Sequence, residues 1–263
     1  MKPAAILCAA AVAVLTPVSA ARAQAAAADA THWNWRGAVA AGKTLEIKGV
    51  NGSVRAEAGT GSQVEVTAEK TARHDDPADV RIEVVEHDGS VTICAVYPGR
   101  NNACEPGDGG HMNVRDNDVQ VRFVARVPTG VAFHGQTVNG GVEATGLTGA
   151  VDLSTVNGAV LIETASGDAS GTTVNGSIRA TVRGQGREPL RFSTVNGSID
   201  VTVASGLNAD FSAETVNGTI ESDFPVTLQG RINPHHLSGR IGQGGRSIRF
   251  STVNGGIRLH TTP

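Results

Sequence analysis

Short runs of alternating apolar and polar residues dominate the second half of the chain, and residues 198–203 (SIDVTV) are typical of them. A period of two predicts strands with one buried face. Similar strand-like runs occur earlier, at residues 63–69, 79–86, 91–97 and 119–127. No window has the apolar spacing of an amphipathic helix with capping residues. The pattern therefore predicts an all-β protein.

A tetrapeptide, Thr-Val-Asn-Gly, occurs six times and places asparagines at Asn139, Asn157, Asn175, Asn196, Asn217 and Asn254. The first five are 18 or 21 residues apart, and the last step is 37 residues, about two periods. Two residues after each glycine stands an aliphatic residue: Val142, Val160, Ile178, Ile199, Ile220 or Ile257. An apolar anchor precedes most copies: Phe133, Leu153, Phe192, Phe211 or Phe250. Self-similarity at a near-constant period indicates a repeat architecture.

Asn-Gly between strands fits two architectures. It can form the two-residue turn of a β-hairpin, which would give an antiparallel repeat sheet. It can also form the corner of a solenoid whose coils stack in parallel, with valine and isoleucine columns inside and a buried ladder of asparagine amides along the axis. Only the second explains why the same residues flank each copy. We therefore expect a parallel β-solenoid (β-helix) with repeats of about 18–21 residues and glycine in positive φ at each corner.

The ends of this solenoid are less regular. A degenerate copy at residues 237–241 is predicted to fill the gap between Asn217 and Asn254, whereas residues 50–54 (VNGSV) form an isolated copy far upstream. A second corner is expected midway through each coil, for example at Thr148 and Gly149. Residues 256–261 read as the final strand, and its open edge is a possible site of pairing with a partner.

The amino-terminal segment has the features of a secretory signal peptide, predicted over residues 1–23. Lys2 precedes an apolar run too short to span a bilayer, and residues 21–23 (ARA) form a cleavage site. We divide the remainder into a linker at 24–43, an irregular β cap at 44–135 and the repeat solenoid at 136–263, continuous with the cap as one domain. No transmembrane segment is expected after cleavage, and the protein should be periplasmic, on the cell surface or secreted.

The mature chain would keep two cysteines, Cys94 and Cys104, which flank a short loop. Because an exported protein meets an oxidising compartment, a disulfide is the favoured interpretation. A zinc site with His111 is the weaker alternative, since zinc needs more well-spaced ligands than these.

Composition excludes some functions. The formal net charge is −3, no basic run occurs, and aromatic residues make up 3% of the chain, so nucleic acid is not an expected partner. Trp33 and Trp35 are expected to pack on the cap rather than to bind a ligand. No catalytic or phosphate-binding motif is present. We expect no cofactor, no metal site and no catalytic residue.

Residues 43–52 (KTLEIKGVNG), residues 125–130 (ARVPTG) and the Thr-Val-Asn-Gly copies behind a signal peptide resemble a bacterial family. This is the adhesin-like, β-strand-repeat family of unknown function (domain of unknown function 4097), and the resemblance covers about residues 40 to 260. It implies a β-solenoid on an exported or envelope-associated protein, and no catalytic residues come with it.

An enzyme hypothesis remains as an alternative, because polysaccharide-active enzymes also use parallel β-helices. Four residues after each repeat asparagine, or its expected equivalent, stand Glu143, Leu161, Arg179, Asp200, Glu221, Gly242 and Arg258. Asp200 and Glu221 would lie one coil apart and could form a carboxylate pair, although a solvated face of mixed charge is the simpler interpretation. His235 and His236 are expected in a surface loop.

The leading hypothesis is a non-enzymatic, exported envelope protein that acts as an adhesin-like structural or binding surface. Its partner would be an envelope protein or glycan. A glycan-active enzyme and an envelope-stress sensor are the alternatives.

Overall fold

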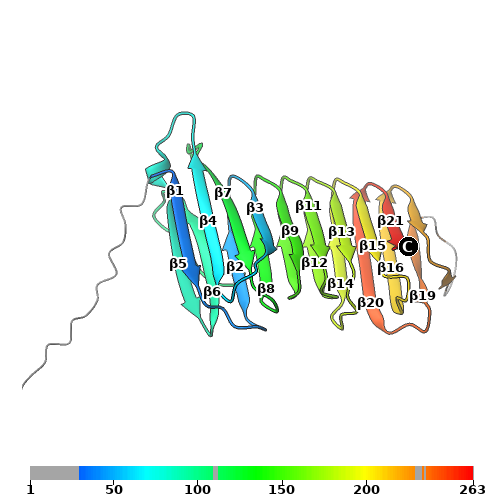
Figure 1. Cartoon of the computed structure of the whole chain (residues 1–263). Coiled ribbons are helices and arrows are strands. Elements are labelled where there is room, and N and C mark those ends of the chain that lie inside the picture. Colours follow the sequence, from blue (N-terminus) through cyan, green and yellow to red (C-terminus); the bar gives the residue numbers. More distant parts are fainter. Residues whose placement is uncertain (1–29, 109–111, 229–232, 234, 263) are drawn as a thin grey trace, which may run out of the picture.

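The computed structural model describes residues 30–108, 112–228, 233 and 235–262 (Figure 1). The expected signal peptide at 1–23 lies outside these residues. Among the described residues, the helical structure is the single 3₁₀ turn η1 (Pro77–Asp79). No helix in this part of the chain is long and apolar enough to cross a membrane.

Two sheets face each other along the length of the molecule (Figure 1). In spatial order the ten-stranded sheet holds β1 (His32–Gly37), β4 (Val64–Thr71), β7 (Gln120–Val127), β3 (Val54–Ala58), β9 (Val142–Leu147), β11 (Val160–Thr164), β13 (Ile178–Val182), β15 (Ile199–Val203), β21 (Ile257–Thr261) and β17 (Ile220–Ser222). The eleven-stranded sheet holds β18 (Val226–Leu228), β19 (His236–Ile241), β16 (Ala209–Asn217), β20 (Arg246–Asn254), β14 (Leu190–Ser193), β12 (Ala169–Thr172), β10 (Val151–Ser154), β8 (Ala132–Gln136), β2 (Thr44–Lys48), β6 (Ser90–Val96) and β5 (Arg81–His87).

Each repeat forms one coil with a strand in each sheet. Thr-Val-Asn-Gly turns the chain from the eleven-stranded to the ten-stranded sheet, as between β10 and β11, and the second corner returns it. Equivalent strands of successive coils pair in parallel, so that Val160 lies beside Ile178 and Ile178 beside Ile199. This confirms the parallel solenoid, and the hairpin alternative is wrong.

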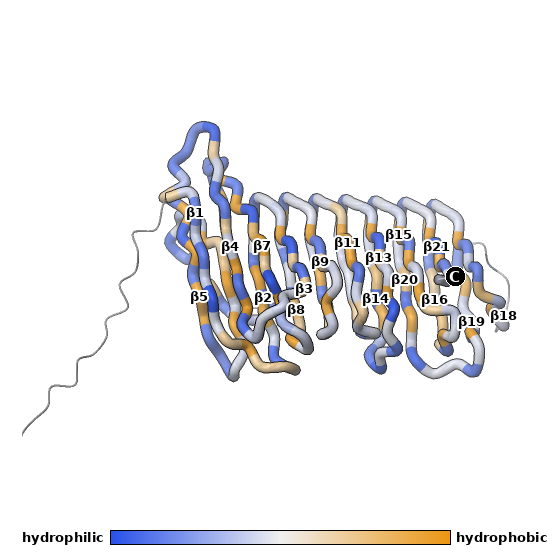
Figure 2. Tube along the Cα trace, viewed as in Figure 1, coloured by the Kyte–Doolittle hydropathy of each residue, from blue (hydrophilic) through white to orange (hydrophobic). Residues whose placement is uncertain are grey.

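The core fills the space between the sheets, and Figure 2 shows apolar positions alternating with polar ones along the strands. The predicted anchors are buried, and Phe250 packs between Phe192 and Phe211 with ring centroids 5.8 and 5.7 Å apart. Burying such a side chain stabilises the fold by roughly 1.5–3 kcal/mol relative to leaving it in water. The repeat therefore builds a continuous apolar column from residues 18 or more positions apart in sequence.

The amino-terminal end is closed by antiparallel strands. β4 pairs with β7 and β1 pairs with β4, while β7 lies parallel to β3. β1 falls within the expected linker at 24–43, and its Trp33 and Trp35 pack against the core, as predicted. β2 and β3 form a coil of their own, so residues 50–54 are the first corner of the solenoid rather than an isolated copy.

The carboxyl-terminal end departs from chain order. β20 lies between β14 and β16, and β21 lies between β15 and β17. The prediction that residues 237–241 form a degenerate coil is wrong, because β19 runs antiparallel to β16. Gly242, Gly244 and Gly245 have positive φ and reverse the chain there, which a solenoid corner does not do.

The prediction of an open edge at residues 256–261 is also wrong. This segment is β21, an internal strand paired on both sides by β15 and β17. The outermost strands at this end of the two sheets are β17 and β18.

Candidate binding surface

The predicted asparagines form one hydrogen-bonded column. Each side-chain Nδ2 donates to the Oδ1 of the next asparagine over 2.7–2.9 Å, in the order Asn217, Asn254, Asn196, Asn175, Asn157, Asn139 and Asn51. Asn51 is thus the first rung, and Asn254 stands between Asn196 and Asn217. These side chains are exposed or half-buried, so the expectation of a buried ladder is wrong. The amides compete with water for the same hydrogen bonds.

The threonine and glycine of each corner hold successive coils together. The buried Thr173 hydroxyl donates to the Gly158 carbonyl of the preceding coil over 3.0 Å, and the other copies repeat this bond. A Cβ on Gly176 would stand 1.9 Å from the Gly158 carbonyl oxygen. Glycine is therefore required by the close approach of two backbones. The expected positive φ applies at two of the seven stacked corner glycines, Gly52 and Gly255.

The valine of each Thr-Val-Asn-Gly copy points outward, so the expectation that it joins an inner column is wrong. The six side chains are between 37% and 61% exposed and form a line at one edge of the eleven-stranded sheet, here termed the valine column: Val138, Val156, Val174, Val195, Val253 and Val216. The corresponding Val50 is buried. The inward residue of the corner is the threonine.

Two further columns run beside the valine column on the outer face of the eleven-stranded sheet. The nearer one is mostly hydroxylated: Gln136, Ser154, Thr172, Ser193, Ser251 and Glu214. The farther one is charged or polar: His134, Asp152, Ser170, Arg191, Arg249 and Ser212. In parallel registered strands, neighbours in each column lie about 4.8 Å apart.

On the outer face of the ten-stranded sheet, opposite charges alternate across strands. Arg258 lies between Asp200 and Glu221, with its guanidinium 3.3 Å from a carboxylate oxygen of each. The structure therefore does not bring Asp200 and Glu221 together one coil apart as the enzyme hypothesis requires, because β21 separates their strands. Gly242 belongs to a reverse turn outside this column.

The neighbouring pair Arg191 and Arg249 was not predicted from the sequence. These residues are directly registered on β14 and β20, and both are exposed. A signal was available, because the heptapeptide Arg-Phe-Ser-Thr-Val-Asn-Gly begins at both positions. Their adjacency could not be read from chain order, since the inserted β20 creates it.

The predicted disulfide between Cys94 and Cys104 is present. It fixes the loop after β6 against the outer face of the eleven-stranded sheet, where Lys48 Nζ donates to the Glu105 carbonyl over 2.6 Å. A groove of about 310 Å³ lies beside this loop and includes Val50 and Val138 in its lining. The loop therefore ends the open part of the valine column.

Glu46 is buried beneath this loop. Its Oε2 accepts hydrogen bonds from the Thr92 hydroxyl (2.7 Å) and the Gly107 backbone N–H (3.0 Å). Its Oε1 has no hydrogen bond of good geometry and is balanced by His134 Nδ1 at 3.3 Å and Lys48 Nζ at 3.6 Å.

The charges around Glu46 change its titration. Burial alone would raise the pKa of Glu46, but His134, the Thr92 and Gly107 donors and Lys48 together lower it to about 2. The same contact with Glu46 raises the pKa of His134 against the effect of burial. This cluster fastens the disulfide loop to the sheet electrostatically.

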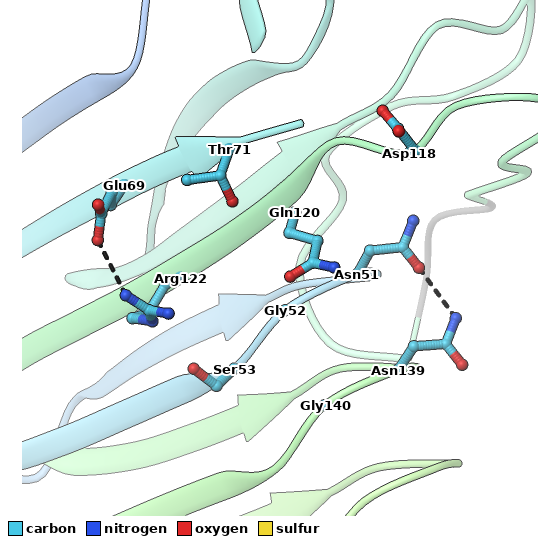
Figure 3. Close-up of a pocket in the computed structure, with 10 residues that line it drawn as sticks. All are labelled: Asn51, Gly52, Ser53, Glu69, Thr71, Asp118, Gln120, Arg122, Asn139 and Gly140. Atoms are coloured by element: carbon cyan, nitrogen blue, oxygen red, sulfur yellow. Dashed lines mark hydrogen bonds and ion pairs between the residues drawn. The ribbon is translucent and has the colours of Figure 1, made fainter. Parts of the chain in front are cut away.

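A polar groove of about 450 Å³ lies where the cap meets the first coil (Figure 3). Figure 3 shows Asn51, Gln120 and Asp118 around it, and Arg122 paired with Glu69. The Arg122 guanidinium lies 3.0 Å from the Glu69 carboxylate. The Asp118 carboxylate accepts hydrogen bonds from the backbone N–H groups of residues 73–75 over 3.0–3.2 Å. The charged residues that line the groove thus already have partners within the protein. The groove also shows no nucleophile hydrogen-bonded to a base.

The remaining candidate ligands do not converge. The expectation of a surface loop is wrong for His236, which begins β19 and has its Nδ1 2.9 Å from Glu214 Oε1. Within the described residues no group of three or more histidine, cysteine, aspartate or glutamate side chains could hold a metal. His111 lies outside those residues.

Comparison with known families decides the affiliation of this repeat. A profile of the family described as Toastrack DUF4097 matches residues 111–260, more than half of the chain. The protein belongs to the Toastrack family. The resemblance noted from the sequence is therefore confirmed, and so is the solenoid-type fold. Among curated proteins no sequence matches this chain.

Two solved structures are similar to this Toastrack protein. A candidate cell adhesion protein from Clostridium sporogenes shares 12% identity, with a TM-score of 0.48 over 88% of this chain and 100% of its own. A candidate adhesin from Bacteroides fragilis shares 12% identity, with a TM-score of 0.25 over 88% of this chain and 97% of its own.

Proposed function

We propose that this Toastrack protein is exported and acts, without catalysis, as a binding module of the bacterial envelope. The outer face of the eleven-stranded sheet would be its contact surface, and an envelope glycan or protein its partner. The signal-peptide features of residues 1–23 support the export.

The observation that carries this proposal is the valine column. Single exposed apolar residues are ordinary on protein surfaces, whereas contiguous apolar patches mark interaction sites. Six half-exposed valines about 4.8 Å apart make such a patch. Buried threonine, isoleucine and phenylalanine side chains form the interior, so the fold does not require apolar residues at these outward positions.

The ion-pair arrangement on the other face supports the non-catalytic part of the proposal. A carboxylate pair acting on a glycosidic bond needs one group able to hold a proton and an open space between them. Arg258 occupies that space and forms an ion pair with both Asp200 and Glu221, so the two carboxylates do not face each other across an open gap.

A sedimentation assay tests the proposal. The chain from residue 24 to 263 is mixed with peptidoglycan, with lipopolysaccharide and with an envelope extract, and bound protein and released saccharides are measured. We expect retention by at least one fraction without release of reducing ends. Retention by none, or cleavage, would contradict the proposal.

A matched pair of variants places the contact. V156T/V174T/V195T replaces three valines by residues of similar shape and should weaken retention by roughly tenfold, a loss of about 1.4 kcal/mol. T145S/T181S/T202S makes equally small changes on the outer face of the ten-stranded sheet and should bind like wild type. Equal binding by both variants would show that the valine column is not the contact surface.

A further inference from the structure

Charged residues at directly registered positions on neighbouring strands carry opposite charges almost everywhere in the described sheets. On the ten-stranded sheet the pairs are Arg36 with Glu65, Glu65 with Arg126, Glu69 with Arg122, Glu57 with Arg126, Arg55 with Glu143, Arg179 with Asp200, Asp200 with Arg258, and Arg258 with Glu221. On the eleven-stranded sheet Asp210 is registered with Arg240, and the registered histidines face carboxylates: His134 lies between Glu46 and Asp152, and His236 lies beside Glu214.

Arg191 and Arg249 are the exception among these registered positions. They lie side by side on β14 and β20, and neither guanidinium forms an ion pair or a hydrogen bond with any described residue. Like charges directly opposite each other destabilise a sheet. Since the same surface elsewhere pairs opposite charges, stability of the fold does not explain this pair.

The surroundings of the pair are rich in hydroxyl groups. Ser170 and Ser212 lie beside the arginines on the flanking strands, and Ser193 and Ser251 lie two residues farther along β14 and β20. Two adjacent guanidinium groups offer planar, charged donors. The Ser170 hydroxyl already donates to Asp152 Oδ1 over 2.6 Å, so the neutral donors come from Ser212, Ser193 and Ser251. One guanidinium fork fits a carboxylate as well as a phosphate. Two forks side by side can bind more than two oxygen atoms, which a sulfate or phosphate group offers and a single carboxylate does not.

Acidic residues limit the width of the ligand. Asp152 lies two strands away from Arg191 on one side, and Glu214 and Asp210 lie on β16, next to β20, on the other. These carboxylates lie about 5–10 Å from the arginines, measured across the strands. This distance is comparable to the screening length at physiological salt, so salt only partly screens their charge. A broad anionic surface such as a membrane would lie over these carboxylates and be repelled by them. A narrow chain running along β14 and β20 avoids them.

We infer that Arg191 and Arg249 form a binding site for a sulfate or phosphate group carried by a linear anionic glycan. The glycan lies along β14 and β20, over Ser193 and Ser251 and toward Val195 and Val253. This inference rests on the proposed function, because it names the ligand chemistry of the same outer face.

The probes share one polymer backbone. Binding of the chain to dextran sulfate, carboxymethyl dextran and uncharged dextran is measured by titration at 50 and 150 mM salt. We expect affinity in the order sulfate, carboxymethyl, uncharged, with the sulfate complex weakened at the higher salt. Equal affinity for the sulfated and carboxymethylated polymers would overturn the assignment to a tetrahedral anion.

R191S/R249S should lower the affinity for dextran sulfate by at least about tenfold, because two charge-assisted contacts are lost. R36S/R55S is the control: it removes the same charge from two exposed arginines that already pair with Glu65 and Glu143. It should leave binding unchanged. Equal losses in the two variants would show a general charge effect and overturn the site.

R249E separates a ligand site from a structural role. It places a glutamate beside Arg191 and restores the opposite-charge pattern of the remaining sheet. We expect its melting temperature to equal or exceed that of wild type while binding of dextran sulfate is lost. A lower melting temperature, or retained binding, contradicts the inference.

Two further outcomes separate this inference from the proposed function. If envelope material is retained equally by wild type and R191S/R249S, the binding module stands and the arginine site is wrong. If the pair binds dextran sulfate but no envelope fraction is retained, the anion site stands and the envelope role is wrong. Tighter binding to phosphatidylglycerol vesicles than to dextran sulfate would identify a membrane as the occupant and overturn the glycan assignment.

Discussion

The two outer faces of this solenoid are built by the same coils, yet they expose different kinds of side chain. On the ten-stranded face, opposite charges such as Arg55 and Glu143 pair across strands, at 2.9 Å in this case. On the eleven-stranded face a line of valines stays exposed and two arginines stand side by side without acidic partners. Both faces cover the same core, so burial cannot account for the difference.

The comparison indicates where a ligand can gain binding energy. A group that is already paired within the protein must lose that partner before it binds another molecule, whereas an unpaired group need not. The eleven-stranded face offers unpaired cations, hydroxyls and apolar surface together. The ten-stranded face offers few such groups, so it suits a supporting role.

The largest expected effect comes from breaking the corner that joins the two faces. Gly140→Ala would put a Cβ 2.0 Å from the Gly52 carbonyl oxygen, whereas at the adjacent Gly141 the nearest atom is 3.5 Å away. We expect Gly140→Ala to cost about 3 kcal/mol of unfolding free energy through overpacking. Gly141→Ala should change it by less than about 1 kcal/mol. Urea denaturation measures both, and similar losses would contradict the stacked-corner account.

A second experiment addresses the covered part of the eleven-stranded face. Because the folded state lowers the pKa of Glu46 from 4.5 to about 2, its contribution is fully present above pH 4.5 and is lost as the pH falls toward 2. The contribution is on the order of 3 kcal/mol. Glu46→Gln should therefore destabilise the protein at pH 6 and much less at pH 2. A pH-independent difference between the two proteins in thermal denaturation would contradict this.

A smaller effect is expected from the asparagine ladder between the faces. Asn175 both donates and accepts within the ladder, and Asn217 at its end only donates. Since water replaces part of each lost bond, Asn175→Ala should cost about 1 kcal/mol and Asn217→Ala about half as much. Chemical denaturation of the two variants checks this, and a larger loss at Asn217 would contradict the ladder order.

The smallest effect compares the faces directly. Arg258→Ala removes a cation that stands between Asp200 and Glu221, so it should lower the melting temperature slightly. Arg249→Ala relieves the repulsion with Arg191 and should leave the melting temperature unchanged or raise it. Differential scanning calorimetry at low salt would show the contrast. Equal decreases would mean that the two faces do not differ as described.

Much of this fold could be predicted because the spacing of the repeated motif can be read directly from the sequence. The spacing of Asn139, Asn157 and Asn175 gave the parallel stacking and the corner positions. The spacing did not show whether the valine or the threonine of each copy points inward, because either side chain can fill an inward position. Threonine was selected by its hydroxyl, which bonds the Gly carbonyl of the preceding coil.

The candidate site could not be predicted for a topological reason. Chain order places the coil of Asn217 between those of Asn196 and Asn254, which would separate Arg191 from Arg249. The turn at Gly242–Gly245 and the antiparallel β19 send the chain back so that β20 enters beside β14. Such an insertion leaves the local alternation of residues unchanged.

Hydroxyl-radical footprinting tests the central claim most directly. The chain is oxidised alone and with an envelope fraction that retains it, and side-chain protection is mapped. The account predicts protection of Val174, Val195 and Val253 on the eleven-stranded face, with Leu161 on the ten-stranded face equally oxidised in both samples. Protection of Leu161 with unchanged oxidation of the three valines would contradict it.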